Sequence, residues 1–195
     1  MTETYVEAAP AALLALQAQL GPQTVLTGDA IPERNRNDWS SQAPAHPIAV
    51  IRPQDAAEVS MALKACAQAG LKVVPQGGLT GLCGGARPED GWVALSMERM
   101  VGIEEVDPAG NTMTVWAGTP LEVIQREADQ AGLFFSLDLG ARGSCAIGGN
   151  LSTNAGGTTA LLRTGRGDQL AVMLSPMACS VLTWTRPKNA VRLSA

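Results

Sequence analysis

Two glycine-rich segments contain the residues best suited to binding a ligand. Residues 75–85 read PQGGLTGLCGG, and residues 143–157 read GSCAIGGNLSTNAGG. Glycine lets the backbone approach a ligand closely and adopt positive φ, so successive N–H groups can converge on an anion. Two such segments could therefore hold a large phosphorylated cofactor from two sides.

The first segment does not match the commonest nucleotide-binding motifs. It lacks the Gly-Lys-Ser/Thr that ends a P-loop, and its glycine spacing breaks the Gly-x-Gly-x-x-Gly dinucleotide fingerprint. What remains is five glycines in residues 77–85, directly after an expected strand. The Thr80 hydroxyl in this segment could donate to a phosphate oxygen.

The second segment combines glycines with short polar side chains, namely Ser144, Asn150, Ser152, Thr153 and Asn154. These side chains suit a ligand that carries both phosphates and a polar heterocycle. Two such segments in one small chain favour a ligand. The alternative, a structural or interaction module in which both segments are only tight turns, stays open at this point.

Helices and strands alternate irregularly around these segments. Helices are expected over residues 11–20, 55–69 and 120–131, each followed by glycine, and strands over 48–51, 71–75, 92–95, 101–106 and 112–117. The last helix has a capping-box pattern from Thr119 to Glu122, with Pro120 at its first position. Because strict β–α–β alternation is missing, the sequence favours the α+β class.

Apolar spacing predicts which face of each longer helix is buried. For the helix over residues 55–69 the expected face is Val59, Leu63, Cys66 and Ala67. For the helix over residues 120–131 it is Leu121, Ile124, Ala128 and Ala131.

Composition excludes several function classes. The 195 residues carry a net charge of −4, which argues against nucleic acid as a partner. No apolar run approaches the roughly 20 residues that a membrane span needs, and the acidic N-terminus does not resemble a signal peptide. The four cysteines lack Cys-x-x-Cys spacing, so we expect reduced thiols, no metal site and a cytoplasmic protein.

Two further candidates for chemistry have simpler explanations. His46 is the only histidine, and its Pro-rich surroundings indicate an ordinary surface residue. Glu104 and Glu105 are adjacent on an expected strand, where neighbouring side chains face opposite ways. A solvated strand edge explains this pair better than a catalytic carboxylate pair does.

Both glycine segments resemble those of a known family. Residues 75–85 are similar to the pyrophosphate loop of FAD-binding domains of the vanillyl-alcohol oxidase type, also called the p-cresol methylhydroxylase (PCMH) type. Residues 137–157 resemble that family's second FAD segment, in the branch of D-2-hydroxy-acid dehydrogenases that oxidise D-lactate, D-2-hydroxyglutarate or glycolate. Supporting matches are PIAVIRP at 47–53 and LSMERM at 95–100, and the similarity covers roughly residues 38–161.

The resemblance implies a PCMH-type fold of two small α/β subdomains and noncovalent FAD, since Leu79 stands where covalently flavinylated relatives have histidine. A 2-hydroxy acid and an electron acceptor would be the partners of the intact enzyme. The implied cofactor-binding residues are Pro75, Gln76, Gly77, Gly78, Leu79, Thr80, Gly81 and Leu82 on one side, and Gly143, Ser144, Gly148, Gly149, Asn150, Asn154 and Ala155 on the other.

The chain departs from the family pattern after the second segment. It reads ALLRTGRGD at residues 160–168, and no Asp or Glu follows Asp168. We therefore expect three parts: an N-terminal helix and connection (1–37), a partial FAD-binding domain (38–168) and an unmatched tail (169–195).

The substrate domain, with the family's metal-binding histidines and substrate-binding arginines, would be missing. The expectation is an N-terminal part of such an enzyme, ended early by a frameshift or gene decay. Changing the reading frame near codon 162 would then restore the family continuation. An inactive remnant, a non-catalytic binding module and a reductase of the enolpyruvyl-sugar type are the alternatives. The run Asp138 to Arg142 disfavours the reductase.

Overall fold

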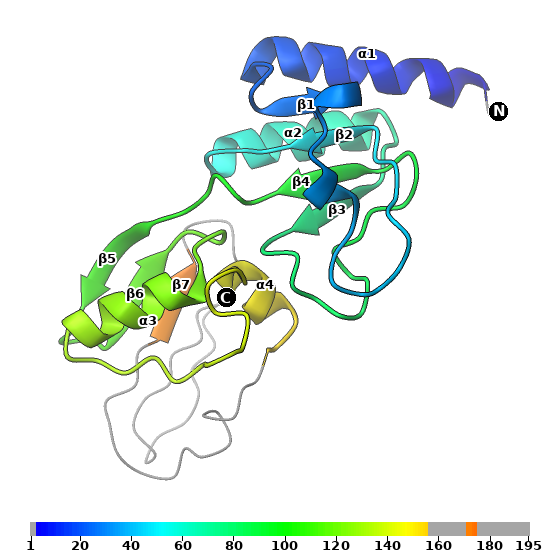
Figure 1. The fold of residues 1–195 in the computed structure, drawn as a ribbon. Helices are drawn as coiled ribbons and strands as arrows, with labels where there is room; N and C mark the ends of the chain where they lie inside the picture. Colours follow the sequence, from blue (N-terminus) through cyan, green and yellow to red (C-terminus); the bar gives the residue numbers. More distant parts are fainter. Residues whose placement is uncertain (1–2, 156–170, 175–195) are drawn as a thin grey trace. The chain divides into compact units, whose positions relative to one another are not determined.

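The computed structural model describes residues 3–155 and 171–174, and the chain forms two compact units, Met1–Arg99 and Met100–Ala195 (Figure 1). Each unit contains its own sheet and its own helices. The expected mixture of α and β elements is therefore confirmed. The expected part boundaries at residues 37/38 and 168/169 remain predictions.

The first unit is built on a four-stranded sheet. Its strand order is β1 (Val25–Thr27), β2 (Ala49–Ile51), β4 (Val93–Ser96) and β3 (Val73–Gln76). Strands β2 and β3 both run parallel to β4, and helix α2 (Ala56–Gln68) connects them, so this part is a β–α–β unit. Helix α1 (Glu3–Leu20) packs against α2 and β1.

The buried parallel strands hold the end of β3, from which the first glycine segment leaves the sheet. Strands β2 and β4 are buried at every position, as continuous apolar strands of parallel sheets are. Val50, Val74 and Ala94 pack together in this core. The backbone N–H of Met97 donates to the carbonyl of Gln76 at 2.9 Å, so the end of β3 is held where residues 77–85 leave the sheet.

Helix α2 begins with a reciprocal cap. The Asp55 carboxylate accepts from the Glu58 N–H at 2.8 Å, and the Glu58 carboxylate accepts from the Gln54 N–H at 2.8 Å. Such a cap satisfies backbone donors that have no partner within the helix.

Replacing the capping aspartate should weaken the first unit. We expect Asp55→Ala to lower the free energy of unfolding by about 1 kcal/mol, because the Glu58 N–H loses its acceptor. Urea unfolding followed by circular dichroism measures this change. Asp55→Asn keeps an acceptor oxygen and should recover most of the loss. An Asp55→Ala chain as stable as the wild type would contradict the role of the cap.

The second unit contains a hairpin and a parallel neighbour. Strands β5 (Ile103–Asp107) and β6 (Thr112–Val115) pair antiparallel, which confirms the expected hairpin. Strand β7 (Ala171–Leu174) runs parallel to β6.

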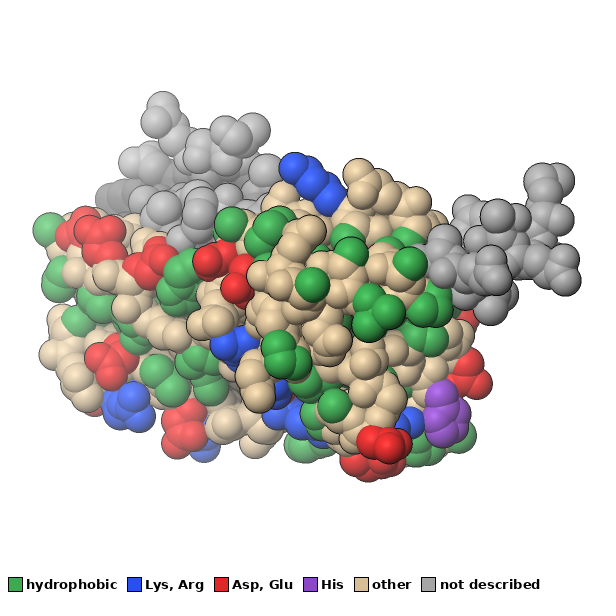
Figure 2. All heavy atoms as spheres, turned by 90° about the horizontal axis from the view of Figure 1, so that it is seen from above, with side chains coloured by type: hydrophobic (Ala, Val, Ile, Leu, Met, Phe, Trp, Pro, Cys, Tyr) green, Lys and Arg blue, Asp and Glu red, His purple; other side chains and the backbone are tan. Residues whose placement is uncertain are grey.

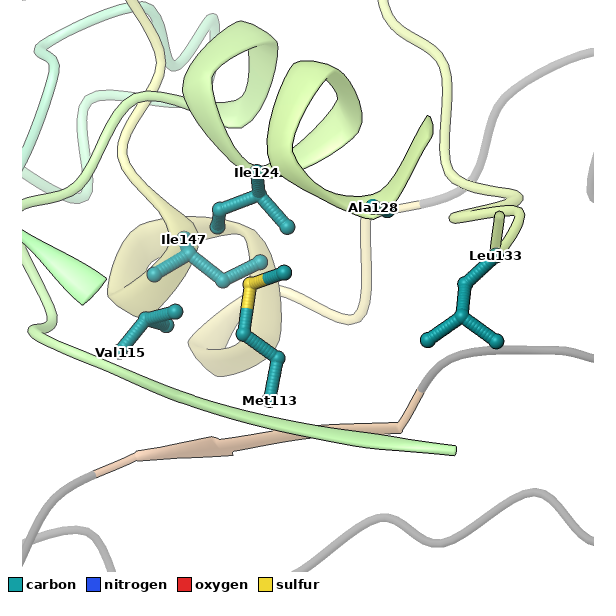
Figure 3. Packing of buried hydrophobic residues seen from close by; sticks show 6 residues of the cluster. All are labelled: Met113, Val115, Ile124, Ala128, Leu133 and Ile147. Atoms are coloured by element: carbon teal, nitrogen blue, oxygen red, sulfur yellow. The ribbon is translucent and has the colours of Figure 1, made fainter. Parts of the chain in front are cut away.

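Helices α3 (Leu121–Gln130) and α4 (Ile147–Ser152) share one core with β6. Figure 3 shows Ile124 and Ala128 of α3 directed toward Met113 and Val115 of β6, with Ile147 of α4 between them. Ile124, Ala128 and Leu121 are buried as predicted, whereas Ala131 is only half-buried. This core fixes α4, and α4 contains the glycine pair of the second segment.

Two local predictions were wrong. The capping box at Thr119 does not form, because Pro120 has an extended backbone and the Thr119 hydroxyl instead bonds both the N–H and the carbonyl of Gly102 at 3.0 Å. On α2 the buried residues are Val59, Ala62 and Cys66, while Leu63 is 41% exposed. Helix α2 packs against α1, a tertiary contact that the apolar spacing of α2 alone does not show.

Candidate functional site

The first glycine segment has a continuous run of unused donors. From Gly77 to Gly85, no backbone N–H has an acceptor among the residues that the structure describes. Backbone N–H groups in a folded protein usually donate to backbone carbonyls, to side chains or to water. Nine consecutive free amides in one loop therefore form a set of donors for an external acceptor, and an oxyanion is the ligand that successive N–H groups bind best.

Glycine in this loop has two different causes. At Gly84 the backbone has φ +77°, and an added Cβ would meet the Gln42 side chain, so the fold itself requires glycine. At Gly81 an added Cβ would find only the Asp38 carboxylate, 3.9 Å away, and at Gly85 it would find nothing within 4 Å. The fold would accept a side chain at these two positions, so packing within the described residues does not explain their glycines.

The structure gives the predicted residues of this segment distinct environments. The Gln76 side chain is fully buried and bonded within the protein, and Leu79 is buried with φ +61°. Pro75 is exposed on β3, and Leu82 is 72% exposed. The Thr80 hydroxyl has no partner among the described residues. Thr80 is thus available to a ligand, whereas the Gln76 side chain holds the loop.

The second segment contains a short helix that the apolar spacing of the sequence does not predict. Helix α4 covers Ile147–Ser152. The hydroxyls of Ser144, Ser152 and Thr153 donate to carbonyls three or four residues earlier in the chain, at 3.2, 2.7 and 2.8 Å. Asn150 is buried and donates to the Cys145 sulfur at 3.4 Å. Several polar side chains of this segment therefore shape the segment itself.

The two glycines of α4 have different surroundings: Gly148 is packed against Ala117, and Gly149 faces open space. An added Cβ at Gly148 would lie 2.9 Å from both Cβ and the carbonyl oxygen of Ala117. An added Cβ at its neighbour Gly149 would find nothing within 4 Å, and Gly149 is exposed. Gly143, Ser144 and Asn154 are also exposed, and Ala155 is half-buried. The exposed members of this set are the ones available to a ligand.

Other candidates for chemistry behave as surface residues. Glu104 and Glu105 are both exposed, as expected. His46 is exposed, with its ring Nδ1 2.9 Å from Arg36, and it is the purple side chain at the surface in Figure 2. Within the described ranges, no three His, Cys, Asp or Glu residues gather as metal ligands. No helix there combines the length and hydropathy of a membrane span.

Sequence reasoning missed the segment that supports the first loop. The sequence alone assigns no role to residues 35–43, yet Asn35 and Asp38 bond the residues at both ends of the loop. In Figure 1 the chain before β2 and the chain after β3 lie side by side. A buried asparagine in a polar loop has no periodic signal, so only the structure could identify it.

A known protein family matches more than half of the chain. The family described as FAD binding domain matches residues 47–173, which include both glycine segments. The chain belongs to this family. The free loop amides and the open glycines therefore lie in an FAD-binding domain.

Relatives and solved structures agree with this assignment. The chain is 38% identical over 145 residues to D-2-hydroxyglutarate dehydrogenase of Xanthomonas citri pv. viticola, covering 74% of this chain and 31% of the relative. It is 38% identical over 149 residues to the mitochondrial D-2-hydroxyglutarate dehydrogenase of Danio rerio, covering 76% and 28%. The chain thus spans about a third of the length of these curated relatives.

Two solved structures share the fold. Alkyldihydroxyacetonephosphate synthase matches with a TM-score of 0.68 at 19% identity, covering 76% of this chain and 30% of that one. p-Cresol methylhydroxylase matches with a TM-score of 0.63 at 21% identity, covering 77% and 30%. The expected PCMH-type fold is therefore confirmed.

Proposed function

We propose that this chain binds FAD noncovalently and is the FAD-binding part of an oxidoreductase that acts on a D-2-hydroxy acid. The observation that carries the proposal is the run of nine free backbone amides from Gly77 to Gly85, inside the region that matches the FAD-binding family. The names of the relatives, D-2-hydroxyglutarate dehydrogenases, support the substrate class.

The donor set of the first segment fits a diphosphate. Backbone N–H groups and one hydroxyl, that of Thr80, can bind an anion through hydrogen bonds without lysine or arginine in the loop. In this proposal the residues from Gly77 to Gly81 bind the diphosphate. Gly143, Ser144, Gly149 and Asn154 would contact the ribityl chain and the edge of the flavin. Gly148 and Asn150 would act indirectly, by fixing α4.

Two observations support noncovalent attachment. Leu79 occupies the position where the resemblance places the histidine of covalently flavinylated relatives, and its side chain is buried. The only histidine, His46, is exposed and paired with Arg36. Because Leu79 cannot bond to a flavin, denaturation should release FAD unmodified from the chain.

Bound FAD supplies an acceptor for the hydride that leaves the α-carbon of the hydroxy acid. The described residues of this chain would bind and orient the cofactor through the amides of residues 77–85 and the exposed groups around α4. A base that takes the hydroxyl proton, and an external electron acceptor, complete the proposed reaction. We assign neither to a residue of this chain.

Titration with FAD tests the first half of the proposal. We expect the purified chain to bind FAD in a saturable way, seen as a change in flavin fluorescence, and to release it intact on denaturation. No binding by a folded chain would overturn the proposal. Oxidation of D-2-hydroxyglutarate or D-lactate with an artificial electron acceptor tests the second half. FAD binding without turnover would mean that the chain is a non-catalytic binding module, the alternative given above.

Cysteine labelling gives an independent readout of the same loop. Cys83 is exposed within the first segment, whereas Cys66 and Cys145 are buried, and burial raises the pKa of the Cys66 thiol. We expect iodoacetamide to label Cys83 readily and the two buried cysteines slowly, because burial keeps the reagent from both and the raised pKa of Cys66 also lowers its share of the reactive thiolate. Saturating FAD should slow the labelling of Cys83. An unchanged labelling rate, measured by mass spectrometry, would contradict cofactor binding at this loop.

We also propose a cytoplasmic location, on the basis of the cysteine usage described above. The Danio rerio relative is named as mitochondrial, so the location differs within the family or the proposal is wrong. Fractionation of source cells, with immunodetection of the chain, decides between these possibilities.

A further inference from the structure

Residues 35–43, here called the brace, are fastened to both ends of the first glycine segment. Asn35 and Gln76 are both 0% exposed. The Asn35 side-chain N–H donates to the Gln76 side-chain oxygen at 2.8 Å. The Gln76 side-chain N–H group donates to the carbonyls of Asn35 and Ala86, each at 3.0 Å. One buried amide therefore links the brace, the last residue before the loop and the first residue after it.

Asp38 makes a second attachment. One of its carboxylate oxygens accepts from the Ala86 N–H at 3.4 Å, and the other accepts from the Ser40 N–H at 3.0 Å. The Arg87 side chain donates to the carbonyl of Ala43 at 2.7 Å. The residues on either side of the loop are held by the brace, while the amides from Gly77 to Gly85 remain free.

These polar contacts are not the most stable way to fill the space. The side-chain oxygen of Asn35 is buried and accepts no hydrogen bond from the described residues. An unsatisfied buried acceptor destabilises a fold, and an apolar pair of similar size would avoid that cost. What a bonded amide pair adds is directionality, which fixes the position of the loop ends.

The negative charge of Asp38 opposes the binding of an anion at the loop. Its carboxylate lies beside the loop, since an added Cβ at Gly81 would be 3.9 Å from it. A negative charge there repels a diphosphate. Its hydrogen bonds to Ala86 and Ser40 give a structural reason for this position.

We propose that Asn35 and Asp38 are positioning residues for the FAD diphosphate, which hold residues 77–85 in the binding conformation before the cofactor arrives. The inference rests on the proposed function, because it needs FAD to bind at this loop. Loops ordered before binding lose less conformational entropy when they bind, so the brace raises the affinity without touching the ligand.

The test compares FAD affinity and loop order in the full chain. We expect Asn35→Ala to raise the dissociation constant of FAD about tenfold. In the FAD-free protein, the NMR order parameters of the amides of residues 77–85 should fall from about 0.85 toward 0.6. Thr24→Val is the control: it removes a part-buried hydrogen bond from Arg99 beside β1, at the opposite edge of the same sheet. This control should change neither measurement.

Asp38→Asn separates positioning from charge. Asparagine offers one acceptor oxygen in place of two, so the brace loses a hydrogen bond, while the charge that repels a diphosphate disappears. Positioning predicts weaker FAD binding, and electrostatics alone predicts tighter binding. This variant decides the question if Asn35→Ala does not fold. Tighter binding by Asp38→Asn would overturn the inference.

The outcomes distinguish the two proposals. If the wild-type chain binds FAD and Asn35→Ala binds it equally well with unchanged order parameters, the brace is not a positioning device. If the folded wild-type chain binds no FAD, the proposed function itself fails.

Discussion

Gly81→Val should abolish measurable FAD binding while leaving the stability of the chain almost unchanged. Glycine is not required there by the fold, because an added Cβ would meet only the Asp38 carboxylate at 3.9 Å, an ordinary contact distance. A branched side chain at this exposed position would stand where a diphosphate must lie to reach the loop amides. We expect the FAD dissociation constant to rise about 100-fold or more, equivalent to about 2.8 kcal/mol.

The control for Gly81→Val is a similar addition at an exposed turn outside the segment. Ala109→Val adds two methyl groups in the β5–β6 turn and should bind FAD like the wild type. Isothermal titration measures the affinities, and urea unfolding should give values within about 0.5 kcal/mol of the wild type for both variants. A Gly81→Val chain that binds FAD with wild-type affinity would contradict the assignment of this loop.

The adjacent glycines of α4 should respond oppositely to alanine. Gly148→Ala forces Cβ to 2.9 Å from Cβ and the carbonyl oxygen of Ala117, both held by the backbone. We expect it to destabilise the chain by about 1–3 kcal/mol, as overpacking does. Gly149→Ala places Cβ in open space within a helix and should stabilise the chain by about 0.5–1 kcal/mol.

FAD binding gives the second half of this comparison. Gly149→Ala should weaken FAD binding about tenfold, or about 1.4 kcal/mol, although the protein becomes more stable. Adding Ala117→Gly to Gly148→Ala should recover part of the lost stability. It removes the Ala117 Cβ, one of the two clashing atoms, and leaves the carbonyl oxygen. Thermal unfolding and titration with FAD measure both effects. If both alanine substitutions changed stability and FAD affinity equally, the assignment of a packing role to Gly148 and a ligand contact to Gly149 would be wrong.

The parts of the fold that depend on local pattern could be predicted from the sequence. The hairpin of β5 and β6 follows from turn residues between two strand-like runs, and the buried face of α3 follows from helical spacing. Leu121, Ile124 and Ala128 are all fully buried on one face of the helix, so a simple period describes them. The glycine segments were also recognisable, because their residue types match a family motif.

The parts that depend on tertiary contacts could not. Thr119 fits a capping box by sequence, but two part-buried hydrogen bonds between its hydroxyl and Gly102 form instead of the cap. Helix α2 packs against α1, and its buried face differs from the one that hydropathy alone predicts. The role of Asn35 depends on a partner 41 residues away, which local sequence cannot reveal.

The packing role of Gly148 belongs to the same category. Its motif reads equally well as a ligand loop or as a helix start, and only the distance to Ala117 distinguishes the two. The motif therefore identifies the segment, and the structure assigns different tasks to neighbouring residues within it.

Hydrogen exchange of the wild-type chain with and without FAD tests the central claim most directly, because it reads the proposed donors themselves. Bound cofactor should slow the exchange of the amides from Gly77 to Gly85 and of residues 143–155, and leave α1 and the β5–β6 turn unchanged. Saturating FAD with no slowing at residues 77–85 would mean that these amides do not hold its diphosphate.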